Sequence, residues 1–203
     1  MSTIRWVLFD LGGVLLEVVQ SRTFQCLEPL TGLAAQEIER RIASTTFFNE
    51  LFIANEFTPA EVAVRLHDVL GVKLLERDVV TALNAELGAE ISTTVDLLPA
   101  LQRRTQIGCL SNTNSIHWDK LLASYPFMRR FDRRFASQLL GCAKPGQEIY
   151  EKVSGLLGAS PREILFFDDK SANVEAAQRV GWHARRYTNH ERLVSDLREY
   201  QLV

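Results

Sequence analysis

Short, unbroken hydrophobic runs alternate with helix-like segments along most of this chain. The run within residues 4–9 ends at Asp10, and the run within residues 163–167 ends at the pair Asp168 and Asp169. Such a run predicts a strand that is buried on both faces, as in a parallel sheet. The alternating strand and helix rhythm of the rest of the chain predicts further strands at 106–110, 133–137 and 183–187, and helices at 94–104, 116–124, 146–157, 171–180 and 190–199. Strands that alternate with helices indicate βαβ units.

A long helical segment, from about residue 23 to 87, interrupts this rhythm and holds no convincing strand. Within it, Thr58-Pro59-Ala60-Glu61 predicts a helix start, with Thr58 as the N-cap and Glu61 three residues later. Four aromatic residues are expected to pack in the core of this segment or to line an entrance to a site: Phe47, Phe48, Phe52 and Phe57. We therefore predict an α/β fold, a Rossmann-like parallel sheet sandwiched by helices, with a small helical cap inserted after the first strand. The core would comprise 1–16 and 90–203, and the cap 17–89.

The two strands that finish in aspartate direct three carboxylates toward one place. In an open parallel sheet, ligands bind in the crevice beyond the carboxyl ends of the strands. Asp10, Asp168 and Asp169 would meet there, and crowded carboxylates repel one another unless a hard cation such as Mg²⁺ lies between them. A single Asp after a strand is explained as an N-cap of the next helix. Aspartates at two strand ends favour a magnesium site, which would in turn attract a phosphate.

Two further segments supply the remaining parts of a phosphoryl-transfer site. The predicted strand 106–110 ends at Ser111 and Asn112, and Lys144 lies in a loop before a predicted helix. A nucleophilic carboxylate, a hydroxyl, a lysine and an acidic metal-binding pair are what transfer through an aspartyl phosphate requires. In this order, the segments resemble the four motifs of the haloacid dehalogenase superfamily. The variants Asp-Leu-Gly-Gly-Val, Leu-Ser-Asn-Thr-Asn and Phe-Phe-Asp-Asp most resemble its branch of sugar-phosphate phosphatases such as α-D-glucose-1-phosphate phosphatase.

The resemblance implies a role for each matching residue. Asp10 would be the nucleophile, and Lys144 would pair with Asp10 and with the phosphate. Ser111 and the backbone N–H of Asn112 would hold the transferring phosphoryl group. The metal ligands would be Asp10, the Gly12 carbonyl, Asp168 and Asp169, with Asp169 the more direct ligand of the acidic pair and Asn173 behind it.

One position departs from the family pattern. Phosphatases of this superfamily usually carry a second Asp two residues after the nucleophile, which protonates the leaving alcohol, and this chain has Gly12 there. Loss of a general acid typically costs roughly 10²–10⁴-fold in rate. The cost is smaller when the leaving oxygen is a weak base, as in a sugar 1-phosphate or an aryl phosphate. Glu17 and His67 are candidates for a substitute proton donor.

Composition and net charge limit the classes of partner that we expect for this chain. The net charge of −2 gives no reason to expect nucleic acid or an anionic membrane as partner, and no apolar run approaches the ~20 residues of a membrane span. Three widely spaced cysteines and the lack of a signal-peptide pattern predict reduced thiols in the cytoplasm.

Three functions remain open at this point. The first is a Mg²⁺-dependent phosphatase acting on a small phosphorylated metabolite. The second is a 2-haloacid dehalogenase, in which Asp10 would attack carbon and no leaving-group proton is needed. The third is a non-catalytic phosphate-binding regulatory protein. The oligomeric state and the substrate itself cannot be predicted from the sequence.

Overall fold

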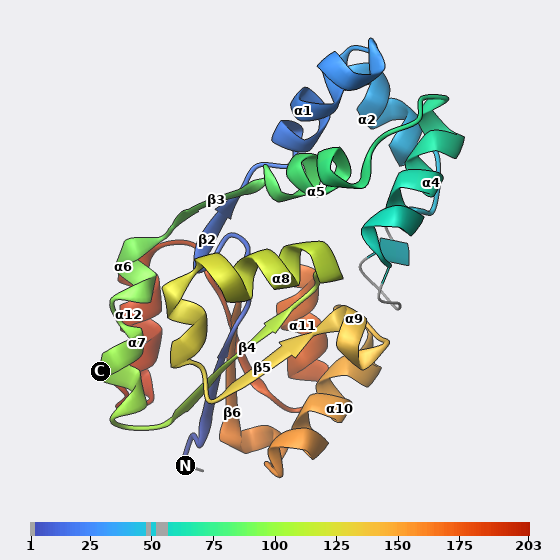
Figure 1. Cartoon of the computed structure of the whole chain (residues 1–203). Coiled ribbons are helices and arrows are strands. Elements are labelled where there is room, and N and C mark those ends of the chain that lie inside the picture. The colour runs from blue at the N-terminus through green and yellow to red at the C-terminus, as the bar shows by residue number, and fades with distance from the viewer. Residues whose placement is uncertain (1–2, 48–49, 52–56) are drawn as a thin grey trace.

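A five-stranded parallel sheet forms the centre of the computed structural model, which describes residues 3–47, 50–51 and 57–203 (Figure 1). Its strand order is β5-β4-β1-β6-β7. The strands are β1 Trp6–Phe9, β4 Gln106–Ser111, β5 Arg133–Ala136, β6 Ile164–Asp168 and β7 His183–Arg186. All five agree with the strands predicted from the sequence. The α/β fold with a parallel sheet is therefore confirmed.

The apolar runs form strands because both faces of the sheet are covered. Val7 and Phe9 of β1 face one hydrophobic cluster, whereas Trp6 and Leu8 face another, as the period of two requires. The first cluster includes residues from α7 Leu98–Gln102, α8 Ser115–Ser124 and α12 His190–Glu199. The second includes residues from α10 Gln147–Leu157 and α11 Ser171–Arg179. The core is thus a three-layer sandwich.

The helix predicted over 94–104 is instead two helices. They are α6 Ser92–Val95 and α7 Leu98–Gln102, and Pro99 lies at the second position of α7. Proline has no backbone N–H to donate within a continuous helix, but in the first turn no such bond is needed. Three short elements were not predicted: α9 Ser137–Leu140, and the 3-10 helices η1 Pro126–Arg130 and η2 Pro161–Glu163.

Four of the described helices between β1 and β4 pack around a hydrophobic cluster of their own. They are α1 Ser21–Thr31, α2 Ala35–Ala43, α4 Pro59–Leu70 and α5 Glu76–Asn84, and they lie beyond the carboxyl ends of the sheet (Figure 1). Ile116 of α8 joins this cluster, so the helical group rests on the core through α8. The capping box at Thr58 and Glu61 is present as predicted. Phe47 and Phe57 pack edge to face, while Phe48 and Phe52 lie outside the described residues.

A two-stranded antiparallel ribbon connects these helices to the core. It consists of β2 Leu16–Val18 and β3 Leu87–Glu90. The sequence predicted no strand at the end of the helical segment, and this prediction was wrong because β3 begins there. Strands this short carry too little alternation to be recognised, and their pairing depends on segments that are distant in sequence. The predicted domain boundaries fall within this ribbon, so the division into core and cap stays a prediction.

Two general features accompany the fold. Cys26, Cys109 and Cys142 carry free thiols. None of the helices in the described part of the chain combines the length and apolar character that a membrane span needs.

Candidate active site

The carboxyl ends of β1 and β6 bring the three predicted aspartates together. These strands are adjacent and parallel, with Phe9 opposite Phe167, so Asp10 emerges beside Asp168 and Asp169. One ligand oxygen from each of the three carboxylates lies within 4.8 Å of the others. Asp10 and Asp168 are buried, and Asp169 is half-buried. The convergence predicted from strand-end aspartates is therefore present in the structure.

Lys144 provides the positive charge at this point. Its ammonium group lies 3.0 Å from Asp10 Oδ1 and 2.7 Å from Asp168 Oδ2, and it donates to the Leu110 carbonyl at 2.8 Å. The side chain is 1% exposed. A buried lysine keeps its charge only when it is paired and hydrogen-bonded. Lys144 and Asp10 are far apart in the sequence, and they meet because the loop after α9 folds over the end of β4.

The pKa values follow from burial and from these charges. The pKa of Asp10 is raised to about 6, mainly by burial and also by the charge of Asp168, while Lys144 opposes this rise. Burial disfavours the charged form of Lys144, but the two aspartates outweigh it and raise the lysine pKa. The pair therefore consists of a carboxylate and an ammonium group at neutral pH. Asp10 Oδ1 also accepts the Leu11 N–H at 2.8 Å. The role of Asp10 as the nucleophile stays a prediction.

The two members of the acidic pair differ in what surrounds them. Asp168 is fully buried and accepts hydrogen bonds from Lys144, from the Lys170 N–H and from the Asn173 amide. Asp169 lines the cleft beside Asp10, and its buried Oδ1 accepts no hydrogen bond from the residues that the structure describes. A buried carboxylate oxygen without a donor is costly.

A divalent cation fits this donor set. Burial and the charge of Asp168 both raise the pKa of Asp169, as expected for crowded carboxylates, and the charges of Lys170 and Lys144 oppose this rise. The hard oxygens of Asp10 and Asp169 are ligands that Mg²⁺ prefers, and the unpartnered Asp169 Oδ1 is free to coordinate. Asp169 lines the cleft, and its role as the more direct metal ligand of the acidic pair stays a prediction.

The residues after β4 position the lysine and present a hydroxyl. Ser111 ends β4, is 5% exposed, and lines the same cleft as Asp10. The Asn112 amide is fixed by a reciprocal pair of bonds, because it donates to the Lys144 carbonyl at 2.8 Å and accepts the Lys144 N–H at 3.0 Å. Asn112 thus holds the lysine loop in place, a role of its side chain that the sequence analysis did not predict.

Comparisons with known proteins agree with this geometry. A family model described as haloacid dehalogenase-like hydrolase matches residues 4–181. The chain belongs to the haloacid dehalogenase-like hydrolases.

Two curated relatives and one solved structure extend across most of the hydrolase. A phosphatase of Mycobacterium tuberculosis is 30% identical over 187 residues, 88% of this chain and 84% of its own. A D-ribitol-5-phosphate phosphatase of Bacteroides thetaiotaomicron is 25% identical, covering 88% of this chain and 89% of its own. A crystal structure of a family enzyme from Bacteroides thetaiotaomicron, in complex with magnesium and inorganic phosphate, has a TM-score of 0.80 and 27% identity, and the match covers 91% of this chain and 94% of that chain.

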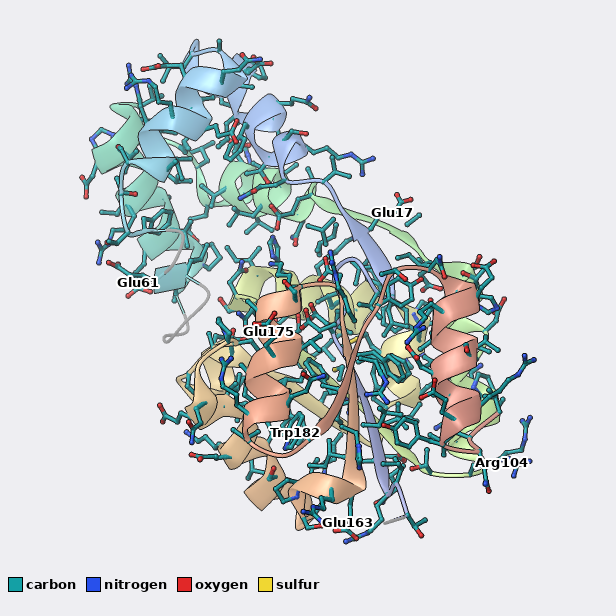
Figure 2. All side chains as sticks on the ribbon, turned by 180° about the vertical axis from the view of Figure 1, so that it is seen from behind. Glu17, Glu61, Arg104, Glu163, Glu175 and Trp182 are labelled. Carbon is teal, nitrogen blue, oxygen red and sulfur yellow. The ribbon has the colours of Figure 1, made fainter. Side chains whose placement is uncertain are left out.

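Gly12 of this hydrolase lies where a side chain would meet the ribbon. A Cβ atom at this position would be 2.9 Å from Val18 Cγ2, so Val18 occupies the space that an acidic side chain would need. Neither of the substitute donors suggested by the sequence is placed for that task. Glu17 is exposed on the ribbon (Figure 2), where its carboxyl group lies beside Gly88 of β3, and His67 is exposed in the last turn of α4.

The cleft of the hydrolase is lined by further titratable residues that the sequence did not indicate as site residues, among them Glu86 and His117. It has a volume of about 790 Å³, which suits a small metabolite. Glu86, between α5 and β3, and His117 of α8 line it together with Asp10 and Lys144. Neither residue belongs to a recognisable motif, and 31 positions separate them in the sequence. Only the packing of the cap helices on α8 brings them together.

Proposed function

We propose that this hydrolase is a Mg²⁺-dependent phosphatase that cleaves a small phosphomonoester through an aspartyl phosphate on Asp10. The observation that carries this proposal is the environment of Asp169 beside the Asp10–Lys144 pair. A dehalogenase needs no cation, and for that chemistry the unpartnered Asp169 oxygen would be an unexplained cost. The two curated relatives that cover most of the chain carry phosphatase names, which supports the same assignment.

The residues of the chain divide the reaction between them. Asp10 Oδ2 attacks phosphorus while its other oxygen stays bound to Lys144 and to the Leu11 N–H. Lys144 keeps its charge near the transferring group, where negative charge has to be offset. Ser111 offers a hydroxyl to the phosphoryl oxygens. Asn112 holds the lysine loop, so the ammonium group does not have to be ordered during the reaction.

Asp10 and Asp169, with the Gly12 carbonyl, would hold the Mg²⁺ ion. When bound, the ion supplies positive charge that offsets the charge of the phosphate and of the acidic cluster. Asp168 then acts mainly by anchoring Lys144, with Asn173 supporting it from behind.

The substrate class and compartment are narrower parts of the proposal. We propose a small phosphorylated metabolite, a sugar or sugar-alcohol phosphate, because the cleft has a matching volume and one relative is a ribitol-5-phosphate phosphatase. Free thiols at all three cysteines support a reducing compartment, and we propose the cytoplasm.

Phosphate release from p-nitrophenyl phosphate tests the proposal directly. We expect turnover with Mg²⁺, loss with EDTA and recovery when Mg²⁺ is restored. Asp10→Asn should remove activity at unchanged fold, because an amide of nearly equal volume cannot attack phosphorus. Halide release from a 2-haloacid without metal would instead establish the dehalogenase. Phosphate binding without any turnover would establish a regulatory protein.

A further inference from the structure

Glu86 is a carboxyl group in the wall of the cleft that the reaction described above leaves unused. It is 5% exposed and lines the cleft with Asp10 and Lys144. Its carbonyl accepts the Val19 N–H at 2.8 Å. The residue before Val19 is Val18, whose side chain fills the space beside Gly12. Glu86 is therefore attached to the part of the ribbon that lies next to the missing acid.

The polar neighbours of Glu86 come from both the cap helices and the core. Thr23 of α1 donates a hydrogen bond to Glu86 Oε2 at 3.2 Å, and His117 Nε2 of α8 lies 3.6 Å from Oε1. The Asn114 Oδ1 atom accepts the His117 N–H, so the amide nitrogen of Asn114 is the donor toward His117 Nδ1 at 3.1 Å. The hydrogen of the histidine ring is then on Nε2 and is donated to the Leu83 carbonyl at 2.9 Å.

These contacts leave Glu86 beside a neutral imidazole. Burial lowers the pKa of His117 to about 4, so the ring does not supply a positive charge at neutral pH. Burial also raises the pKa of Glu86 to about 7, against the smaller effect of the Thr23 hydrogen bond. A carboxyl group in this range can both give and take a proton at neutral pH, which general acid–base catalysis requires.

We infer that Glu86 is the general acid and base of this phosphatase, protonating the leaving oxygen in place of the side chain that Gly12 lacks; the inference rests on the proposed function. In the first step, the bond between Asp10 Oδ2 and phosphorus forms as the bond to the leaving oxygen breaks. The Glu86 proton moves to that oxygen. In the second step, water attacks phosphorus, its proton passes to Glu86, and the bond to Asp10 breaks. Both residues then return to their initial states.

A purely structural role is the competing explanation, because Glu86 also joins α1 to α8. The two roles differ in how turnover depends on the leaving group. A proton donor matters most when the departing oxygen is strongly basic, as in a primary alkyl phosphate, and least for p-nitrophenyl phosphate. A residue that only holds the cap in place would affect both substrates by the same factor.

The experiment compares Glu86→Gln with wild type on aryl and primary alkyl phosphates in Mg²⁺, with Glu17→Gln as the matched control. Glu17 is exposed on the ribbon (Figure 2), and its carboxyl group lies beside Gly88. We expect Glu86→Gln to lower kcat/KM for the alkyl ester roughly 10²-fold or more. For the aryl ester, the factor by which kcat/KM falls should be at least ~10-fold smaller. In wild type, the alkyl rate relative to the aryl rate should fall above about pH 7, and the substitution should remove that dependence.

Glu86→Asp keeps the acid and serves as the second variant. It should recover part of the alkyl rate that Glu86→Gln loses. Equal slowing of both esters by Glu86→Gln overturns the inference, and so does an equal change of selectivity in Glu17→Gln. If wild type hydrolyses no phosphate ester, the proposed function fails and the role of Glu86 fails with it. The two failures are distinguishable, because only the first leaves wild-type turnover intact.

Discussion

Glu86 should make the stability of the folded chain depend on pH, and this can be measured without substrate. Burial raises the pKa of its carboxyl group from 4.5 to about 7. Between these values the folded state keeps a proton that the unfolded state releases. The group therefore contributes stability that is fully present below about pH 4.5 and is lost as pH rises through about 7. A difference of about 2.5 pH units corresponds to about 3 kcal/mol of unfolding free energy.

The perturbation is Glu86→Gln, which keeps the volume and removes the titration. We expect the loss of unfolding free energy from pH 5 to pH 8 to be smaller in the variant than in wild type by about 2 kcal/mol, because this interval covers most of the titration. Urea denaturation at the two pH values measures it. Asp10 and Asp169 titrate in both proteins, so their contribution cancels in the comparison.

Glu17→Gln provides the control, since an exposed carboxyl group should have almost no effect on that difference. If Glu86→Gln and wild type lost the same free energy between the two pH values, Glu86 would not be a buried proton-holding group. The assignment of its pKa and the catalytic role built on its environment would then both be refuted.

Three other substitutions test the geometry of the site. Gly13→Ala would place a Cβ atom 2.7 Å from Asp169 Oδ2 at a φ of +75°. It should therefore raise the Mg²⁺ concentration for half-maximal activity at least ~10-fold, and an unchanged Mg²⁺ requirement would contradict this prediction. Lys144→Met leaves the carboxylates of the site facing one another without the ammonium group and should abolish turnover. Without Mg²⁺, it should also lower the unfolding free energy measured by urea denaturation by ~3–5 kcal/mol, and a loss below ~1 kcal/mol would contradict this prediction. Gly12→Asp should speed up alkyl phosphate turnover more when it is combined with Val18→Ala than when it is made alone. Equal rates for the single and the double variant would show that Val18 does not limit the space beside position 12.

Much of this protein is determined by local sequence features. The short, unbroken apolar runs that form β1 and β6 are typical of strands covered on both faces, and the strand–helix alternation predicted the other three strands of the parallel sheet. Parallel strands end at the same edge, and for that reason the convergence of Asp10 with Asp168 and Asp169 followed from their positions after two such runs. The family resemblance of these motifs agrees with the match over residues 4–181.

Tertiary structure decided what depends on contacts between distant segments. The ribbon of β2 and β3 forms only when the two ends of the helical group meet, and neither strand is long enough to be recognised alone. The ribbon places Val18 against Gly12, so that any side chain at position 12 would require Val18 to shift. Burial is likewise a tertiary property. In the sequence Glu86 is one acidic residue among many, and only its burial in the folded chain raises its pKa to about 7, against the opposing hydrogen bond from Thr23.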